Sequence, residues 1–476
     1  MTLAITLYFI LVFVLMGKLL LYGIRPTKTL AWLLAIFTIP VGGILFYFAL
    51  GRNRKKNKFY TLKKTEDISK YLDKVEEYHQ NVGKENNVPL AIQNYIKLAK
   101  LITKSSNFLP TIGNELIPLK NGTATFDAIF TALETAEKFI HIQYYIFEEG
   151  DLADKFKSIL IRKASEGVQI RLLYDALGSR TLSKKYINNL KANGIEVYGF
   201  LPMRLGRLLS SINYRNHRKI VIVDGLIGFT GGINVSDKYV SGDPVLGNWY
   251  DTHLQLKGAV VNSLQAVFAM DWSFATSTDN LLNTKYFIKH DSYGKSIAQV
   301  VSGGPDSDFS SILQLYFSII NSAKKYVYIT NPYIIPGEAL KQALQVAAMS
   351  GIDVRLLLSA NSDSLLVKWT VRSSFEDLLE SGVKIYLYPD GFLHSKVIVS
   401  DDELTSIGTA NLDIRSFEVN YEVNVLVYDS DITTKLKQDF LKDCIKSKQL
   451  NFQQFIKRPK TERLKEGIAK VFSPVL

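Results

Sequence analysis

The sequence predicts an α/β protein in which two copies of one α/β unit with mixed sheets follow an N-terminal transmembrane pair of helices. Three observations lead to this fold class. The first 50 residues hold two long apolar segments, the rest alternates amphipathic helices with short apolar strands, and the order of these elements occurs twice. At 476 residues the chain also exceeds what one hydrophobic core usually supports, so several structural units are expected.

Two apolar segments open the chain, over residues 3–23 and 30–50. Each has about 20 residues, the length of a helix that crosses the hydrocarbon core of a membrane. A cleavable signal peptide would have a shorter apolar stretch and a small-residue cleavage site, so the pair is expected to be retained as a hairpin. Pro40, Gly42 and Gly43 predict a kink in the second helix, and a re-entrant hairpin that dips into one leaflet stays open as an alternative.

The formal net charge of +12 is concentrated beside these segments. Residues 1–64 hold ten of the 57 Lys and Arg and no Asp or Glu, so the remaining chain, with 45 acidic residues, is nearly neutral. Seven of these cations lie in residues 52–64, and by the positive-inside rule they place the C-terminal bulk on the cytoplasmic side of the cell membrane. Such a run also attracts anionic lipids, whereas the near-neutral remainder argues against nucleic-acid binding.

The predicted organisation has four regions: the transmembrane hairpin with its basic run (1–64), a charged helical connector (65–108), and two α/β domains (109–280 and 281–476). The elements predicted in the first domain are a helix over 125–136, a strand over 139–147, a helix over 151–167 and a strand over 168–173. Those predicted in the second are a helix over 307–323, a strand over 326–330, a helix over 336–351 and a strand over 352–358. The repeated order suggests two domains related by a pseudo-twofold axis, with at least partly parallel sheets.

A polar motif, H-x-K-x4-D, occurs once in each domain. Six residues separate the aspartate of each copy from a glycine turn that ends in asparagine. The two copies consist, in order, of His217, Lys219, Asp224 and Asn234, and of His394, Lys396, Asp401 and Asn411. Two matches of this length at equivalent places make a chance occurrence improbable, and they indicate one composite site.

These residue types suit phosphodiester exchange. Residues two apart on a strand share a face, so each histidine is expected beside its lysine. With the two copies brought together, one neutral imidazole can attack phosphorus, while the other donates a proton to the leaving alkoxide and later deprotonates the incoming hydroxyl. The lysines and asparagines would hold the non-bridging oxygens. Neither a cofactor nor a metal is expected, because acidic residues are sparse around the motifs.

The aspartates of the motifs follow their histidines at an odd offset, so the strand pattern favours a scaffolding role for Asp224 and Asp401 over proton transfer. A catalytic histidine also needs a partner on its other ring nitrogen. Asp251 and Glu422 begin the strands that follow the asparagine turns. We predict that they orient the histidines, each across the domain interface, with ordinary surface carboxylates as the alternative.

At these residues the sequence closely resembles the phospholipase D superfamily, whose duplicated motif is H-x-K-x4-D followed by G-G/S/T-x-N. More narrowly it is similar to the bacterial cardiolipin synthase family, over segments that include residues 51–56, 141–147, 331–336, 391–394, 408–417 and 473–476. The resemblance implies two phospholipase D-like domains and a phosphatidyl-histidine intermediate. It also implies reversible phosphatidyl transfer from one phosphatidylglycerol to the glycerol hydroxyl of another, which gives cardiolipin and glycerol.

Carried over residue by residue, the resemblance makes His217 the nucleophile and His394 the general acid and base, with the reverse assignment open. It marks both lysines, Asp224 and Asp401 as active-site residues too, which conflicts with the strand argument for the aspartates. Gly232 stands where many superfamily members have serine, which would remove one hydroxyl from the phosphate cradle. The implied partners are phosphatidylglycerol and anionic membrane lipids, with no nucleic acid, and self-association stays open.

Several alternatives remain at this point. A hydrolytic phospholipase D, or a phosphatidyltransferase that uses another alcohol such as serine, differs only in the acceptor pocket. A nuclease of the superfamily fits the near-neutral charge of the two domains less well. A non-catalytic scaffold fits the two intact motifs less well. Residues 201–211, with Arg204 and Arg207, form an amphipathic basic segment that is predicted to lie in the headgroup region. The remaining histidines, which follow no metal-ligand spacing and are expected to be structural, are His79, His141, His253 and His290.

Overall fold

The structure is a computed structural model that describes residues 2–22, 26–39, 41–47, 90–202, 214–278, 281 and 284–473. The predicted basic run at 52–64, most of the connector, His79 and residues 203–211 of the amphipathic segment lie outside the described residues.

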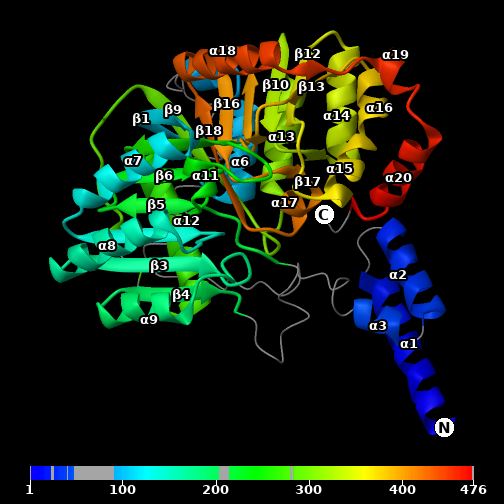
Figure 1. Cartoon of the computed structure of the whole chain (residues 1–476), viewed down its shortest axis with the longest axis horizontal. Helices are drawn as coiled ribbons and strands as arrows, with labels where there is room; N and C mark the ends of the chain where they lie inside the picture. Colours follow the sequence, from blue (N-terminus) through cyan, green and yellow to red (C-terminus); the bar gives the residue numbers. More distant parts are fainter. Residues whose placement is uncertain are drawn as a thin grey trace.

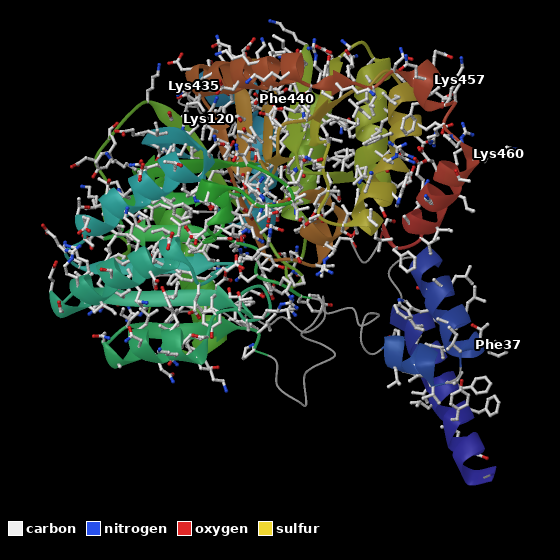
Figure 2. All side chains as sticks on the ribbon, viewed as in Figure 1. Phe37, Lys120, Lys435, Phe440, Lys457 and Lys460 are labelled. Atoms are coloured by element: carbon white, nitrogen blue, oxygen red, sulfur yellow. The ribbon has the colours of Figure 1, made fainter. Side chains whose placement is uncertain are left out.

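Three helices open the chain: α1 (Thr2–Tyr22), α2 (Pro26–Thr38) and α3 (Gly42–Phe46). They pack through a small apolar cluster that contains Val12, Leu15, Leu19, Ile36 and Ile44. The helical path breaks between α2 and α3, where the kink is predicted, although Pro40 itself is outside the described residues. Other apolar side chains point outward, among them Phe37 (Figure 2). Within the described residues, no helix combines the length and the apolarity that a membrane span requires.

The rest of the chain is built around a large mixed sheet (Figure 1). The first half contributes β1 (Thr111–Lys120), β2 (Phe139–Tyr144), β3 (Gln169–Asp175), β4 (Glu196–Phe200), β5 (Ile220–Val223), β6 (Ile227–Gly231) and β8 (Thr252–Lys257). The second half contributes β9 (Ser296–Gly303), β10 (Tyr326–Asn331), β12 (Asp353–Ser359), β13 (Lys384–Tyr388), β15 (Val397–Ser400), β16 (Leu404–Gly408), β18 (Glu422–Tyr428) and the short β19 (Lys448–Gln449). These strands are rich in buried Ile, Val and Leu, as expected for a sheet covered on both faces.

The strand order repeats outward from the centre of the sheet. It is β1-β8-β6-β5-β2-β3-β4 in the first half and β9-β18-β16-β15-β10-β12-β13 in the second, with β19 at the outer edge. Three strands of each half run parallel to one another: β2, β3 and β4 in the first half, and β10, β12 and β13 in the second. The other neighbouring strands of the sheet pair antiparallel. The duplicated α/β unit with mixed sheets is therefore confirmed. Because β1 pairs antiparallel with β9, the two halves share one continuous sheet among the described residues.

Helices cover both faces of this sheet at corresponding places. In the first half they are α7 (Asn121–Glu134), α8 (Asp151–Ser165), α9 (Lys184–Ala192) and α12 (Val260–Thr276). In the second they are α13 (Ser311–Ser322), α14 (Gly337–Met349), α15 (Leu365–Arg372), α16 (Phe375–Glu380), α18 (Ser430–Lys446), α19 (Phe452–Phe455) and α20 (Lys460–Lys470). The helices and strands predicted from the repeat all occur, with bounds that shift by a few residues.

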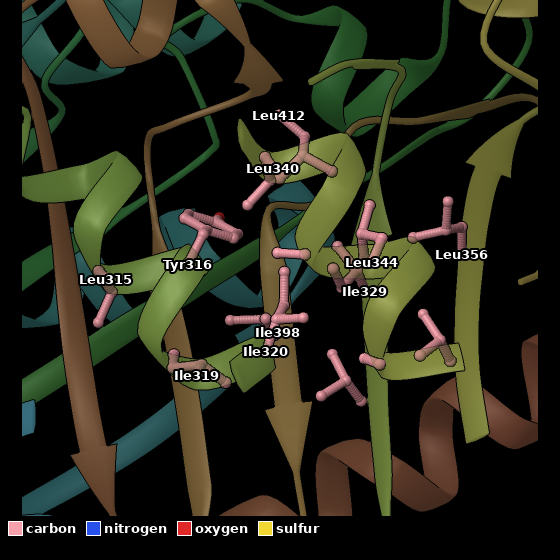
Figure 3. Close-up of a cluster of buried hydrophobic side chains, with 14 of the residues drawn as sticks. Leu315, Tyr316, Ile319, Ile320, Ile329, Leu340, Leu344, Leu356, Ile398 and Leu412 are labelled. Atoms are coloured by element: carbon pink, nitrogen blue, oxygen red, sulfur yellow. The ribbon is translucent and has the colours of Figure 1, made fainter. Parts of the chain in front are cut away.

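One core lies under α13 and α14, where Leu315 and Ile319 of α13 meet Ile329 of β10 and Ile398 of β15 (Figure 3). Two further helices, α5 (Leu90–Gln93) and α6 (Ile96–Ser106), add apolar side chains such as Ile102 to this core. The described part of the predicted connector is therefore packed into the second half of the protein.

A second core is common to both halves. It contains Leu254 of β8 and Phe268 of α12 from the first half together with Val425 of β18 and Phe440 of α18 from the second. The halves are thus held together by apolar packing as well as by the β1–β9 pairing, and this fixes the two motifs relative to each other.

Candidate active site

Backbone hydrogen bonds between the two halves position both motif histidines. The N–H of His217 donates to the carbonyl of Tyr421 at 2.9 Å, and the N–H of His394 donates to the carbonyl of Tyr250 at 2.7 Å. Beside the second contact, β14 (Phe392–Leu393) pairs in parallel with β7 (Trp249–Tyr250). Each histidine is therefore fixed to the segment that immediately precedes a strand of the other half.

The prediction that both motif histidines lie on strands is wrong. β5 begins at Ile220 and β15 at Val397, which makes each H-x-K triplet an extended lead-in to its strand. The lysine nevertheless folds back on its histidine in both copies: Lys219 Nζ donates to the carbonyl of His217 at 2.7 Å, and Lys396 Nζ donates to the carbonyl of His394.

A carboxylate from the opposite half binds each imidazole. Nδ1 of His217 lies 2.9 Å from Oε2 of Glu422, and Nδ1 of His394 lies 2.7 Å from Oδ2 of Asp251. Both carboxylates are buried, at 0% and 2% exposure, so water cannot compete for these contacts. A carboxylate on Nδ1 favours the tautomer that carries its proton there, and this leaves Nε2 as the ring nitrogen for chemistry.

Burial also sets the charge of these groups. It lowers the pKa of His217, against the opposing effect of Glu422. Burial, followed by the nearby Lys396 ammonium, lowers the pKa of His394 to about 3. Both shifts favour the neutral imidazole at pH 7, which is the state a nucleophile requires.

The two motif lysines are fully buried, with 0% exposure. Burial lowers the pKa of Lys219 to about 7 and that of Lys396 to about 8, because the ammonium is costly away from water. Lys219 also lies over the ring of Tyr145, 5.2 Å from its centroid. A bound phosphodiester anion would favour the charged form of both lysines.

Each asparagine amide donates to a tyrosine hydroxyl. Nδ2 of Asn234 lies 3.2 Å from the hydroxyl oxygen of Tyr239, and Nδ2 of Asn411 lies 2.9 Å from that of Tyr333. The hydroxyl of Tyr239 is in turn 3.2 Å from Nδ1 of His394, so it links an asparagine of one half to the histidine of the other.

Comparisons with known proteins agree with this geometry. The family profile described as "Cardiolipin synthase, PLD-like domain" matches residues 129–272 and 316–444, and the profile described as "Phospholipase_D-nuclease N-terminal" matches residues 4–52. The cardiolipin synthase of Geobacillus kaustophilus (strain HTA426) is 41% identical over 456 residues, which cover 95% of this chain and 89% of the relative. That of Geobacillus thermodenitrificans (strain NG80-2) is 42% identical over 462 residues, with the same coverage. The chain belongs to the cardiolipin synthase family.

Membership of the cardiolipin synthase family makes this chain a phosphatidyl-transferring enzyme with phospholipase D-like domains. Among solved structures, the phosphatidylserine synthase of Haemophilus influenzae Rd KW20 superposes with a TM-score of 0.60 at 13% identity, covering 79% of this chain and 99% of its own. That likeness extends the agreement to the fold of the two halves.

In this member of the cardiolipin synthase family, the motif aspartates lie away from the histidines, in turns between strands. Asp224 accepts the backbone N–H groups of residues 137–139, and Asp401 accepts those of residues 324–326. Both adopt positive φ, near +53° and +54°. Asp224 and Asp401 therefore tie the motif turn to the start of the neighbouring strand, and their place among the catalytic residues has no support in the geometry.

The glycine turns differ between the two halves in a way that corrects the expected phosphate cradle. The hydroxyl of Thr409 donates to Oε2 of Glu422 at 2.5 Å, so it serves the carboxylate that binds His217. At the matching place in the first half, a Cβ on Gly232 would clash with the carboxylate of Asp251. The absence of a side chain at Gly232 therefore leaves room for the Asp251 carboxylate. The expected loss of a hydroxyl from the phosphate cradle does not follow.

Neither Tyr239 nor Tyr333 is among the residues that the sequence predicts for the site. Tyr239 lies five residues after Asn234, and Tyr333 lies in the Asn-Pro-Tyr segment that begins at the last residue of β10. Of the other histidines, His141 is buried and its Nδ1 lies 2.9 Å from Gln265, and His253 is buried beside the site. Among the described residues, no group of His, Cys, Asp and Glu is arranged to hold a metal ion.

Proposed function

We propose that this enzyme makes cardiolipin from two molecules of phosphatidylglycerol, with release of one glycerol, through a phosphatidyl-histidine intermediate. The observation that carries the proposal is the pair of imidazoles, each with its Nδ1 bound by a buried carboxylate of the other half. The sequence similarity to cardiolipin synthases of two Geobacillus species supports the choice of substrate and product.

In the first half-reaction, Nε2 of His217 attacks phosphorus of one phosphatidylglycerol and a P–N bond forms. The P–O bond to the glycerol headgroup breaks, and His394, which takes up a proton when the phosphodiester anion binds, gives this proton to the leaving glycerol oxygen. In the second, the primary hydroxyl of another phosphatidylglycerol attacks phosphorus, gives its proton to His394, and displaces Nε2 of His217. Both histidines then return to their starting state, so the reaction is reversible.

His217 is the better candidate for the nucleophile. Its Nδ1 lies 2.9 Å from Glu422, so the proton stays there and the lone pair stays on Nε2. Nδ1 of His394 instead has Asp251, Lys396 at 2.9 Å and Tyr239 around it, which allows either ring nitrogen to carry the proton. A histidine that can exchange its proton suits the general acid and base.

The lysines and asparagines are proposed to hold the phosphate. Lys219 and Lys396 gain charge when the phosphodiester anion arrives, because their pKa values of about 7 and about 8 lie close to the working pH. Asn234 and Asn411 would offer their amides to the non-bridging oxygens, with Tyr239 and Tyr333 fixing the orientation of those amides.

We also propose that the N-terminal helices anchor the enzyme in the cell membrane, with the catalytic halves on the cytoplasmic side. The apolar segments at 3–23 and 30–50, the seven cations at 52–64 and the match to the N-terminal family profile support this topology. Exposed apolar side chains on α1 and α2, such as Phe13 at 69% and Phe37 at 71%, suit lipid contact.

The test is incubation of the purified enzyme with phosphatidylglycerol as the sole phospholipid, in a chelator and without divalent cations, followed by lipid mass spectrometry. Cardiolipin with one glycerol per product is the expected result. Phosphatidic acid alone would make water the acceptor and would overturn the proposed transfer. Absence of turnover until a divalent cation is added would overturn the metal-independent chemistry.

A further inference from the structure

The C-terminal helix α20 buries the carboxylate of Glu466 and exposes its large apolar residues Leu464 and Ile468, the reverse of an ordinary surface helix. Glu466 is 2% exposed and forms ion pairs with Arg458 at 2.7 Å and Arg372 at 3.2 Å. Glu462 pairs with Arg372 at 2.7 Å. These contacts hold α20 against α15, so its outward face is fixed.

The outward face is an apolar stripe. Leu464 and Ile468 are four residues apart on α20, and Val471 and Phe472 follow at its end, so the four side chains lie on one side of the helix. They are exposed by 65%, 56%, 74% and 46%. Helix α15 runs antiparallel to α20, because the Thr370 hydroxyl donates to the carbonyl of Ala469 while Arg372 pairs with Glu462. Leu365, at the start of α15 and 75% exposed, therefore extends the stripe at the C-terminal end of α20.

Lysines border this stripe. Lys460, Lys465 and Lys470 are exposed on α20, and Lys457 precedes it; Lys457 and Lys460 project outward at the edge of the molecule (Figure 2). Within the part of the chain that the structure describes, no carboxylate pairs with any of these four lysines. A stripe of large apolar side chains bordered by cations is the pattern of a helix that lies in the headgroup layer of an anionic bilayer.

One end of the stripe follows a loop that contacts residues beside the site. α15 begins just after a loop in which Asn361 Nδ2 donates to the carbonyl of Gly391 at 3.0 Å, three residues before His394. Burial raises the pKa of the Tyr333 hydroxyl, and the nearby charges of Asp413 and of Asp363, which lies in the same loop, raise it further. Contact between α15, α20 and a bilayer would therefore bring the lipid surface close to the loop beside the catalytic histidine.

We propose that α20 and the start of α15 form a second membrane contact, in which Leu365, Leu464, Ile468, Val471 and Phe472 enter the headgroup layer of an anionic bilayer. This contact serves the proposed function, because it orients the two halves so that phosphatidylglycerol can pass from the bilayer to the site. It is separate from the N-terminal anchor and from the chemistry, so it can be measured without turnover.

The test uses the full-length chain with Cys444 replaced by Ala and one new cysteine that carries an environment-sensitive fluorophore. The protein is reconstituted into vesicles of phosphatidylglycerol and phosphatidylcholine that contain a lipid with a spin label on its acyl chain. The label sits at Leu464→Cys or, as the matched control, at Ile445→Cys. Ile445 is an apolar residue, 85% exposed, on α18, which lies along the top of the molecule in Figure 1, whereas α20 lies at the right-hand side.

The expected result is strong quenching at position 464 and none at 445. Absence of quenching at 464 would overturn the proposal. Quenching of that fluorophore by a spin-labelled second copy of the chain, without quenching by the spin-labelled lipid, would also overturn it, because the stripe would then be a protein–protein contact. Product formation from phosphatidylglycerol, measured on the unlabelled enzyme, tests the proposed function separately.

A second measurement links the contact to catalysis. The Leu464→Asp, Ile468→Asp double variant should lose about tenfold or more of its turnover on vesicle-borne phosphatidylglycerol. It should keep its thermal midpoint and its turnover in detergent micelles, where substrate reaches the site without a bilayer. The Ile445→Asp control should behave as the wild type in both. Equal turnover of the double variant and the wild type on vesicles would contradict the proposal.

Discussion

Glu422 and Asp251 each bind a histidine that belongs to the other half of the chain. Neither half therefore contains a complete histidine–carboxylate pair. Both carboxylates are buried, so removing one would leave an imidazole without a fixed tautomer in a site that water does not enter freely. The two pairs are alike in chemistry but differ in support, because only Glu422 receives a hydroxyl from its own glycine turn, that of Thr409.

The Glu422→Gln variant tests this orienting role. The amide keeps the shape of the carboxylate but cannot stabilise an imidazolium or fix the Nδ1 proton, so kcat should fall by about 10²- to 10⁴-fold. KM should change little, because Glu422 is not proposed to contact lipid. Turnover close to that of the wild type, with an unchanged pH profile, would rule out the role. The thermal midpoint serves as the control for folding.

Thr409→Val keeps the shape of the side chain but removes the hydrogen bond to Glu422, together with the one that the hydroxyl accepts from the N–H of Val423 at 2.9 Å. Loss of a bond to a charged group costs about 1.5 to 3 kcal/mol, so kcat should fall by roughly 10- to 100-fold. Thr405→Val is the matched control, since this buried threonine of β16 bonds only to the carbonyl of Ile398. If both variants lose equal activity, the effect comes from packing and not from Glu422.

The pH dependence of stability follows from buried histidines. Burial lowers the pKa of His141 and of His253 to about 3, whereas an unfolded chain has histidine pKa values near 6.5. Below about pH 6.5 the unfolded state binds protons that the folded state does not, so stability that is present above this pH is lost as pH falls. Each pH unit costs about 1.4 kcal/mol for each histidine.

Thermal unfolding should show this loss as a midpoint that decreases between about pH 6.5 and pH 4.5. The His253→Asn variant should have a shallower dependence than the wild type. A midpoint that is flat over this range would contradict the neutral buried state of these histidines.

Much of the site could be predicted at the residue scale, because its parts repeat in the sequence. The duplicated motif gave His217 and His394, and the first residues of the following strands gave Asp251 and Glu422 as candidates. Tyr239 could not be found in this way. It lies on the short helix α11 (Lys238–Ser241) and reaches His394 only because the two halves pack together.

At the scale of elements, alternation of apolar strands and amphipathic helices was enough to locate most of the α/β unit. The pattern could not place α6, because a short amphipathic helix shows which of its faces is apolar but not which sheet that face meets. In the structure its buried face packs on β9 and α13, and Tyr95 just before it donates to Glu403 at 2.7 Å. The described part of the predicted connector therefore stabilises the second half.

The Ile102→Ala variant tests the contribution of α6. Ile102 is fully buried in the core of the second half, so the cavity should cost about 2 to 5 kcal/mol of unfolding free energy. The matched change Ile112→Ala, on β1, removes a side chain that is 62% exposed and should cost little. Denaturant unfolding measures both. Equal, small losses would mean that α6 is only loosely attached.

At the scale of the whole molecule, the β1–β9 pairing and the core shared by α12 and α18 join the halves. The two α/β units should therefore unfold in a single transition by calorimetry. Each half expressed alone would expose residues such as Phe268 or Val425, and it should aggregate or stay unfolded. Two separate transitions, or a soluble folded half, would contradict this cooperative arrangement.

The crossed pairs also determine when the enzyme can become active during its own synthesis. His217 precedes its carboxylate by 205 positions in the chain. At about 5 to 20 residues per second, a ribosome needs roughly 10 to 40 s to add that stretch. During this interval the rest of the first half is completed behind the N-terminal helices, while His217, the proposed nucleophile, lacks its partner. A nascent chain that has reached the bilayer therefore cannot attack the lipids around it until translation is almost finished.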